Sequence, residues 1–249
     1  TTFRRDVQTD GRHATVVFAD TLDDDLARRD FTINAVAWHP LRKEIRDPFG
    51  GRRDLREGIL RTVGEPRERF AEDRLRILRA LRFAGRFRMV VEADTWAALT
   101  AGVDGVRRLS PERVREELLK VLGGPGRPSD ALELYRRSGA LAVVAPELGA
   151  LAPEQWSRTV AEVDALAPHR PWLRLAALLA RTGEPPGSPG DPDPDSVKGL
   201  EAADPAAARG ARRTVALLSR LRASNAQLAR TSALVAAGRT PPDPADEGG

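Results

Sequence analysis

The chain has 249 residues, enough for one large domain or two small ones with a real core. Its net charge of +4 and pI near 10.2 permit a nucleic-acid partner without requiring one. It has no cysteine, which excludes disulfides and thiolate metal sites, and its longest apolar run, residues 175–180, is too short to span a bilayer. We therefore expect a soluble cytoplasmic protein with no membrane contact, and we expect no metal at His13, His39 or His169.

The N-terminal part predicts a small amount of β structure. Residues 14–19 are short and rich in β-forming residues, and residues 33–38 and 43–46 can form a hairpin. Residues 47–51 read Asp-Pro-Phe-Gly-Gly and predict a turn. The paired glycines suit a hinge or a close approach of the backbone to a ligand, and a plain loop is the equal alternative.

After residue 51 the pattern is almost entirely helical. One helix is predicted from 67 to 87, with an apolar face that includes Ile77 and Leu81. Further helices are predicted from Pro111 to just before Gly123, and at 128–138, 153–166, 170–182, 203–221 and 224–237. The predicted fold class is mainly α, α+β overall, with a small N-terminal β part followed by a long helical body.

Changes in composition suggest where the chain divides. Residues 183–196 are rich in proline, glycine and aspartate, which cannot form a packed core and indicate a flexible linker. We divide the chain into an N-terminal β part at 1–60, a first helical region at 61–125, a helical body at 126–182, the linker at 183–200, C-terminal helices at 201–238 and a disordered tail at 239–249.

Asp73 and Arg76 lie three residues apart on the predicted helix and so share one face. One interpretation is an intrahelical ion pair, which contributes only about 0.2–0.5 kcal/mol. The other is recognition of a nucleobase, because cytosine and adenine both present an amino donor beside a ring-nitrogen acceptor. A carboxylate and a guanidinium at fixed spacing match that edge and oppose the edge of uracil or guanine, and each bidentate match is worth about 1–3 kcal/mol.

Arg79 and Arg82 continue the three-residue spacing along the same helix. Neighbouring arginines repel one another, and immobilising each long side chain costs about 2 kcal/mol of rotamer entropy, so stability alone rarely explains such a row. They can bind a triphosphate or an RNA backbone. The alternative is a solvated basic face, to which Arg86 and Arg88 also contribute.

A second polar cluster lies within residues 25–35. Arg29 can bind a phosphate, and Asp30 and Asn34 can hydrogen-bond the hydroxyls of a ribose. The alternative interpretation is a charged turn in front of a strand or helix.

Three motifs, in this order, strongly resemble the class II tRNA nucleotidyltransferase/poly(A) polymerase family of bacteria. They are Arg-Arg-Asp-Phe-Thr-Ile-Asn-Ala at 28–35, Asp-Pro-Phe-Gly-Gly with a following Asp-Leu at 47–55, and Glu-Asp-Arg-Leu-Arg at 72–76 with the arginines beyond it. Residues 109–118 also resemble the family's neck-to-body region. The similarity covers about residues 1–150, and the three ordered motifs are far more specific than any one of them.

The resemblance implies the C-terminal part of a nucleotidyltransferase head at 1–60 and a nucleotide- and RNA-binding neck at 61–125. It implies an enzyme that adds C, C and A to tRNA 3′ ends from CTP and ATP, with release of pyrophosphate. The implied nucleotide-binding residues are Arg29, Asp30, Asn34, Asp73, Arg76, Arg79 and Arg82, with Asp73 and Arg76 as a protein template for the base. RNA contacts are expected from Arg86, Arg113 and Arg115, and no protein partner is inferred.

The family's metal site is expected upstream of this chain, which begins at Thr1. In the family an Asp-x-Asp pair holds two Mg²⁺ ions for phosphoryl transfer. Asp23 and Asp25 have that spelling but lie too close to the 28–35 motif, and the aspartates at 191–195 lie in the proline-rich linker. The resemblance therefore implies Mg²⁺ ligands outside this chain, no catalytic residue in it and an inactive fragment when it is tested alone.

Residues 173–179 resemble the helix that precedes a metal-binding His-Asp pair in some relatives. Ala180 and Arg181 stand in place of that pair, so we expect a structural helix and no phosphohydrolase activity. Two alternatives to CCA addition stay open: a poly(A) polymerase of the same family, and a helical RNA-binding module without catalysis. Enzymes that add only CC or only A also fit the motifs.

Overall fold

The computed structural model describes residues 5–9, 14–17, 21–180, 182 and 205–237. Within these ranges the protein is mainly helical, as predicted, with a few short strands in the N-terminal part. The predicted linker at 183–200 and the predicted tail at 239–249 lie outside the described residues.

The strands form pairs rather than one sheet. They are β1 (Arg5–Thr9), β2 (Ala14–Val17), β3 (Ala37–His39), β4 (Glu44–Arg46), β5 (Ile59–Leu60) and β6 (Val90–Val91). β1–β2 and β3–β4 are antiparallel and β5–β6 is parallel. The predicted hairpin is therefore confirmed at 37–46, but residues 32–34 form a 3-10 turn rather than the start of its first strand.

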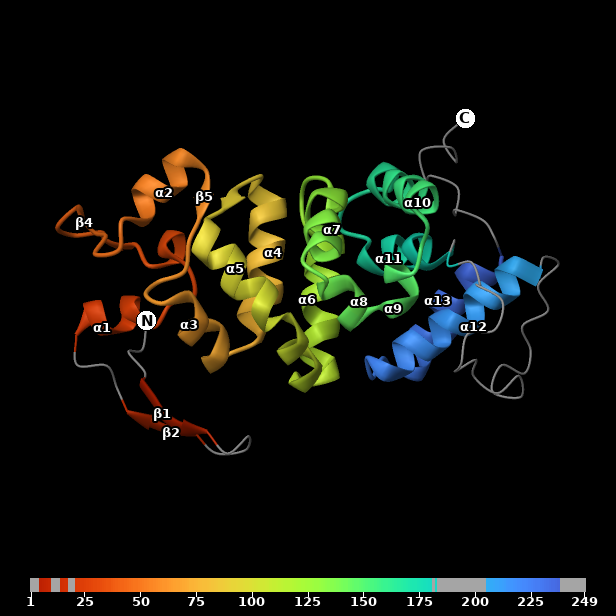
Figure 1. Ribbon diagram of the computed structural model, residues 1–249, viewed down its shortest axis with the longest axis horizontal. Coiled ribbons are helices and arrows are strands. Elements are labelled where there is room, and N and C mark those ends of the chain that lie inside the picture. Colours follow the sequence, from red (N-terminus) through yellow and green to blue (C-terminus); the bar gives the residue numbers. More distant parts are fainter. Residues whose placement is uncertain (1–4, 10–13, 18–20, 181, 183–204, 238–249) are drawn as a thin grey trace.

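The helices account for most of the described chain. In the N-terminal half they are α1 (Leu22–Ala27), η1 (Thr32–Asn34), α2 (Gly51–Glu57), α3 (Pro66–Glu72), α4 (Leu75–Phe87), α5 (Ala93–Gly102), η2 (Val103–Arg108) and α6 (Pro111–Gly123). In the C-terminal half they are α7 (Pro128–Arg137), α8 (Ala140–Val144), α9 (Pro146–Gly149), α10 (Pro153–Ala165), α11 (Pro171–Ala180), α12 (Pro205–Arg220) and α13 (Asn225–Ala236). Figure 1 shows α1 and the β3–β4 hairpin toward one end of the long axis and α12 and α13 toward the other, with α4 and α6 to α11 between them.

The prediction of one continuous helix over 67–87 is wrong. The chain breaks between α3 and α4, where Asp73 has an extended backbone with φ −145° and ψ 107°. The reason is local: the Asp73 carboxylate accepts a hydrogen bond from the Leu75 N–H at 3.0 Å, which serves the start of α4 instead of continuing α3. The helical spacing expected for Asp73 and Arg76 therefore does not apply, because only Arg76 lies on α4.

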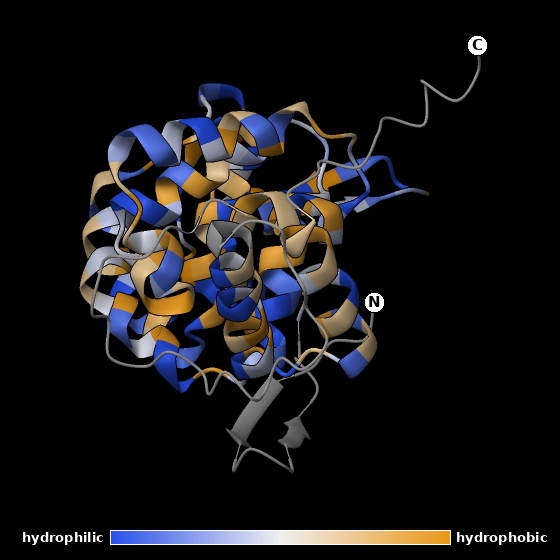
Figure 2. Ribbon diagram, turned by 90° about the vertical axis from the view of Figure 1, so that its right-hand side faces the viewer, coloured by the Kyte–Doolittle hydropathy of each residue, from blue (hydrophilic) through white to orange (hydrophobic). Residues whose placement is uncertain are grey.

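One apolar core runs through the described helices. It extends from Phe31 in the N-terminal part to Val235 in α13 and includes the buried face of α4. Gly85 on α4 faces Ala131 on α7, and a Cβ at Gly85 would stand only 2.3 Å from the Cα of Ala131. The lack of a side chain at Gly85 therefore allows α7 to pack directly on α4. Figure 2 shows hydrophobic and hydrophilic stretches alternating along the helices, as amphipathic packing around a common core requires.

The C-terminal helices are tied to α6 and α9 by arginines. Arg115 on α6 donates to the carbonyl of Leu221 at 3.0 Å and also to that of Arg222, in the turn between α12 and α13. Arg220 binds the Glu147 carboxylate with two bonds of 2.6 and 2.9 Å. These contacts fix the α12–α13 pair against α6 and α9. None of the described helices has both the length and the apolar character needed to cross a membrane.

α11 is the core helix that residues 173–179 predicted, since Leu175, Leu178 and Leu179 are buried. Arg174, on the same helix, is only 2% exposed. Its Nη1 donates to the Leu122 carbonyl at 2.8 Å, and its Nε and Nη2 donate to the Leu166 carbonyl at 3.2 and 2.6 Å. One guanidinium thus satisfies the C-terminal ends of α6 and α10, although burial lowers the pKa of Arg174.

Arg174→Met is expected to lower the free energy of unfolding by about 2–4 kcal/mol, because the thioether leaves the buried Leu122 carbonyl and the part-buried Leu166 carbonyl without this donor. Arg174→Lys should recover only part of the loss, since an ammonium cannot span both helix ends as a planar fork does. Urea denaturation measures the change. Arg158→Ala, at an exposed position on α10, is the matched control and should stay within about 0.5 kcal/mol of the unsubstituted protein. Equal midpoints for Arg174→Met and the control would contradict this role.

Candidate nucleotide and RNA site

Three elements meet at the candidate site: the 28–34 loop, α3 and α4. The loop is held by Asp25, which is buried at the end of α1. Its carboxylate accepts from Arg28 Nε at 2.9 Å and from Arg29 Nη2 at 2.7 Å. Burial raises the pKa of Asp25, but the hydrogen bonds from Arg29 and Arg28 outweigh it, so the pKa of this carboxyl lies below its ordinary value. Asp25 is therefore an ionised anchor for the two arginines.

Asp30 is the centre of the site. Its Oδ1 accepts from the Phe31 N–H at 3.0 Å and from Asn34 Nδ2 at 2.9 Å. Its Oδ2 accepts from Arg79 Nε at 2.7 Å, with Arg79 Nη2 at 2.6 Å. The structure thus brings together three of the residues singled out in the sequence, Asp30, Asn34 and Arg79, from two segments that are far apart in the chain.

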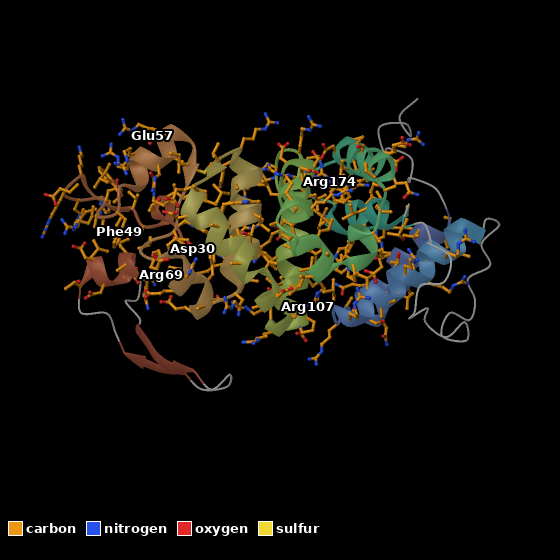
Figure 3. All side chains as sticks on the ribbon, viewed as in Figure 1. Asp30, Phe49, Glu57, Arg69, Arg107 and Arg174 are labelled. Atoms are coloured by element: carbon orange, nitrogen blue, oxygen red, sulfur yellow. The ribbon has the colours of Figure 1, made fainter. Side chains whose placement is uncertain are left out.

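Arg76 links all three elements. Its Nη1 donates to the Arg69 carbonyl at 3.1 Å and to the Glu72 carboxylate at 2.6 Å, and its Nη2 donates to the Arg28 carbonyl at 3.1 Å. The ion pair of Arg76 is therefore with Glu72 across α3 and α4, and the intrahelical pair with Asp73 is not formed. In Figure 3, Asp30 and Arg69 lie near each other toward the N-terminal end, and Arg174 lies far from them.

Asp73 pairs with a residue that its sequence neighbourhood does not reveal. Its Oδ2 accepts from Arg113 Nη2 at 2.8 Å, and Arg113 stands in the first turn of α6. The two side chains are 35% and 47% exposed. Asp73 thus lies at an accessible place between α3, α4 and α6, and its backbone carbonyl accepts from the Arg76 N–H at 3.1 Å.

The remaining arginines have different surroundings. Arg82 is buried and forms an ion pair with Glu117 of α6, and its guanidinium lies 4.2 Å from the centroid of the Phe83 ring. Arg86 lies 5.3 Å from the centroid of the Phe87 ring. Arg79 lies over the same Phe83 ring at 5.4 Å, but Arg82 pairs with Glu117 whereas Arg79 pairs with Asp30. Arg115 has a structural partner in the α12–α13 turn. The predicted nucleotide role of Arg82 and the RNA roles of Arg86, Arg113 and Arg115 stay predictions.

The 47–55 motif supports the segment of chain that follows Asp30. The Asp47 carboxylate accepts from the N–H groups of Gly51 at 2.7 Å and Arg52 at 3.0 Å, and so caps α2. A Cβ at Gly51 would stand 2.0 Å from the carbonyl oxygen of Thr32, so this glycine permits close backbone packing. Buried Asp54 accepts from Thr32 Oγ1 at 2.7 Å. α2 thereby fixes the turn that follows Asp30.

A cavity of about 720 Å³ opens beside the loop. Arg29 and Asn34 line it, together with α1 and the β3–β4 hairpin. It does not reach Asp73 or Arg76. An anion entering this cavity would meet the guanidinium of Arg29, which is 41% exposed at its side chain.

Among the residues that the structure describes, none fits the Mg²⁺ pair that the resemblance implies. Asp23 is engaged by Arg46, and Asp25 is engaged by Arg28 and Arg29. In the ranges that the structure describes, no three histidine or acidic side chains gather closely enough to hold a metal ion. The aspartates at 191–195 lie outside those ranges.

Sequence reasoning missed Asp25, Glu72 and Asp54 as supports of the site. Two of them carried a signal, since Asp25 stands three and four residues before Arg28 and Arg29, and Glu72 stands four before Arg76. The pairing of Asp73 with Arg113 carried none, because 40 residues separate the two.

Comparison with known proteins agrees with the motifs. Residues 1–61 match the poly A polymerase head domain, and residues 88–151 match the probable RNA and SrmB-binding site of polymerase A. The CCA-adding enzyme of Leuconostoc mesenteroides is 37% identical over 185 residues, which are 73% of this chain and 44% of that protein. The multifunctional CCA protein of Laribacter hongkongensis is 49% identical over 133 residues, or 53% of this chain and 32% of that protein. The chain thus spans less than half the length of either relative.

Solved structures give the same relationship. The Bacillus stearothermophilus CCA-adding enzyme in complex with CTP is 30% identical with a TM-score of 0.54, and the match covers 99% of this chain and 60% of that one. A tRNA nucleotidyltransferase complexed with a primer tRNA and an incoming ATP analog is 34% identical with a TM-score of 0.52, over 66% of this chain and 51% of that one. With the ordered motifs and the two matched regions, these likenesses show that the chain belongs to the tRNA nucleotidyltransferase/poly(A) polymerase family.

Proposed function

We propose that this chain is the nucleotide-selecting and RNA-holding part of an enzyme that adds CCA to the 3′ ends of tRNA. The RNA 3′-hydroxyl attacks the α-phosphate of CTP or ATP, and pyrophosphate leaves. The observation that carries the proposal is the convergence of Arg76 and Arg79 on the 28–34 loop, through the Arg28 carbonyl and the Asp30 carboxylate. Base-reading and ribose-reading groups then share one junction.

Each group has a distinct task in this proposal. The Asp73 carboxylate accepts from the amino group of cytosine or adenine, and Arg76 donates to the adjacent ring nitrogen. Asp30 and Asn34 bind ribose hydroxyls, while Arg29 and Arg79 bind phosphates. Uracil and guanine place an acceptor toward Asp73 and a donor toward Arg76, so both contacts become repulsive or unpaired. We assign no Mg²⁺ ligand to the described residues.

The helical part would hold the RNA. Arg86 and Arg113 stand on α4 and α6, and the region 88–151 matches a probable RNA-binding site of polymerase A. Contacts to phosphates position an RNA without reading its sequence, which suits an enzyme that acts on many tRNAs.

The test is incorporation by the full-length protein on tRNA that lacks its CCA end, with each nucleotide supplied separately. We expect addition of C and then A, with U and G rejected. Long A tails on RNA would instead identify a poly(A) polymerase, and no incorporation of any nucleotide would reject the enzymatic proposal in favour of an RNA-binding module.

Asp73→Ala in the full-length protein is expected to reduce the preference for CTP over UTP by about tenfold or more, because the acceptor for the amino group is lost. Ratios of kcat/KM for the four nucleotides measure the change. Asp104→Ala, at an exposed position in η2, removes a carboxylate elsewhere and should leave the ratios unchanged. Unaltered rejection of UTP and GTP by Asp73→Ala would show that Asp73 does not read the base.

A further inference from the structure

We propose that Arg113 is a positioning residue that orients the Asp73 carboxylate and thereby sets the selectivity for amino-bearing bases. The inference rests on the proposed function and adds to it a residue from a different element. Arg113 then acts on the base through Asp73, without touching the base itself.

The carboxylate of Asp73 is held at both oxygens. Oδ1 accepts from the Leu75 N–H at 3.0 Å, and Oδ2 accepts from Arg113 Nη2 at 2.8 Å. A carboxylate has about four lone-pair sites, so each oxygen keeps one site for a further donor. Arg113 therefore does not need to leave for a base to bind. It fixes the direction in which the free lone pairs point.

The two halves of the base reader differ in how firmly they are held. Arg76 is 16% exposed at its side chain and contacts Glu72 and the carbonyls of Arg69 and Arg28. Asp73 stands between two helices and is about one-third exposed. Without Arg113, the Asp73 carboxylate would keep only the bond from the Leu75 N–H at Oδ1, and nothing would fix the direction of Oδ2. The acceptor is thus the half whose orientation depends on one side-chain partner, Arg113, and one backbone N–H.

The position of Arg113 is itself determined by neighbours on both sides. Val114 is buried beneath the first turn of α6. Glu112 accepts from Arg222 Nη1 at 3.2 Å, and Arg115 binds the carbonyls of Leu221 and Arg222. The start of α6 is therefore anchored on the α12–α13 turn, and Arg113 projects from a fixed base toward Asp73.

The exposure of the pair separates positioning from stability. Ion pairs exposed to solvent contribute little to folding, so loss of Arg113 should barely change the melting temperature. A side chain whose removal leaves the fold intact but alters nucleotide choice is acting on the site. This combination of outcomes distinguishes the proposal from a structural role.

The experiment compares Arg113→Ala, Arg113→Lys and Arg107→Ala in the full-length protein, with steady-state incorporation of CTP, ATP and UTP on tRNA. Arg107 is exposed in η2 and provides the matched loss of one arginine. We expect Arg113→Ala to raise KM for CTP and ATP by about tenfold, because a misdirected Asp73 carboxylate loses its charge-assisted hydrogen bond from the amino group of the base, with a smaller change in kcat. The CTP-to-UTP ratio of kcat/KM should fall, and lysine should restore part of it.

A double variant tests whether Arg113 acts through Asp73. In an Asp73→Asn background, Arg113→Ala should cause no further loss of selectivity, whereas independent residues would give additive losses. Additive losses overturn the proposal, as does an Arg113→Ala profile equal to that of Arg107→Ala. If the unsubstituted protein adds neither C nor A, the proposed function is wrong, and this inference, which depends on it, is wrong as well. Thermal unfolding of each variant identifies any loss caused by misfolding, and Arg113→Lys then supplies the selectivity test.

Discussion

Glu117→Ala is expected to lower the free energy of unfolding by about 3–5 kcal/mol, because it leaves the buried guanidinium of Arg82 without a counter-charge. Glu117 is fully buried on α6, and its carboxylate accepts from Arg82 of α4 and, at 3.4 Å, from Lys120. Tyr135 of α7 lies beside this pair, and burial raises the pKa of its hydroxyl. The loss should appear in urea and thermal unfolding of the protein.

A double substitution distinguishes the loss of a counter-charge from the loss of packing volume. Arg82→Met with Glu117→Leu removes both charges, and well-packed apolar replacements of a buried ion pair are often neutral or stabilising. The double variant should therefore be more stable than Glu117→Ala. Should it be less stable, the penalty comes from packing and the unpaired charge is not its cause. A folded double variant also tests the predicted nucleotide role of Arg82, since normal CTP addition by the full-length form would exclude that role.

Gly51→Ala is expected to destabilise the protein by about 3 kcal/mol and to abolish nucleotide binding by the full-length form. The added Cβ would stand 2.0 Å from the Thr32 oxygen and 2.8 Å from the Val36 Cγ2, so the backbone of α2 and η1 must separate. Asp30 precedes η1 and Asn34 is its last residue, so the alignment of both with Arg79 would be lost. Denaturation and titration with CTP measure the two effects.

Gly58→Ala is the matched control for this prediction. Gly58 ends α2 with φ +67°, and no atom lies within 4 Å of the position a Cβ would occupy. Its substitution carries only the backbone cost of a left-handed alanine, about 1–2 kcal/mol, and should leave CTP binding intact. Equal losses of binding in the two variants would show that the packing of α2 on Thr32 does not organise the site.

The fold was predictable where helices carry strong end signals. α6, α7, α10, α11 and α12 each begin at a proline, and Gly139, which follows the end of α7 and stands before α8, has a φ of +82°. α2 was missed because it is short and its first N–H groups are capped by Asp47, which lies before the helix. α5 was missed because its buried residues include Thr95 and Ala98 and do not form a clear apolar stripe. The two-residue strands β5 and β6 pair across 31 positions and leave no local pattern.

The site was predictable in its residue types but only partly in its contacts. The structure brings Asp30, Asn34 and Arg79 into contact at the Asp30 carboxylate, while their nucleotide role stays a prediction. The Asp73 environment was not predictable, because a helix break and a partner on α6 replace the expected spacing on one helix. Both features depend on tertiary packing, which periodicity in a single segment does not report.

Only Lys43, Lys120 and Lys198 are lysines among the 40 basic residues, a bias easily attributed to the base composition of a genome. The planar guanidinium of Arg174 binds the carbonyls at two helix ends, so lysine at this position would lower the stability of the fold. Part of the bias toward arginine therefore has a thermodynamic reason. A gene drifting toward lysine codons could exchange many solvent-facing arginines without loss of stability, yet it would meet selection at the few positions where one planar guanidinium binds the carbonyls of two helix ends. Those positions should change last as related genes diverge.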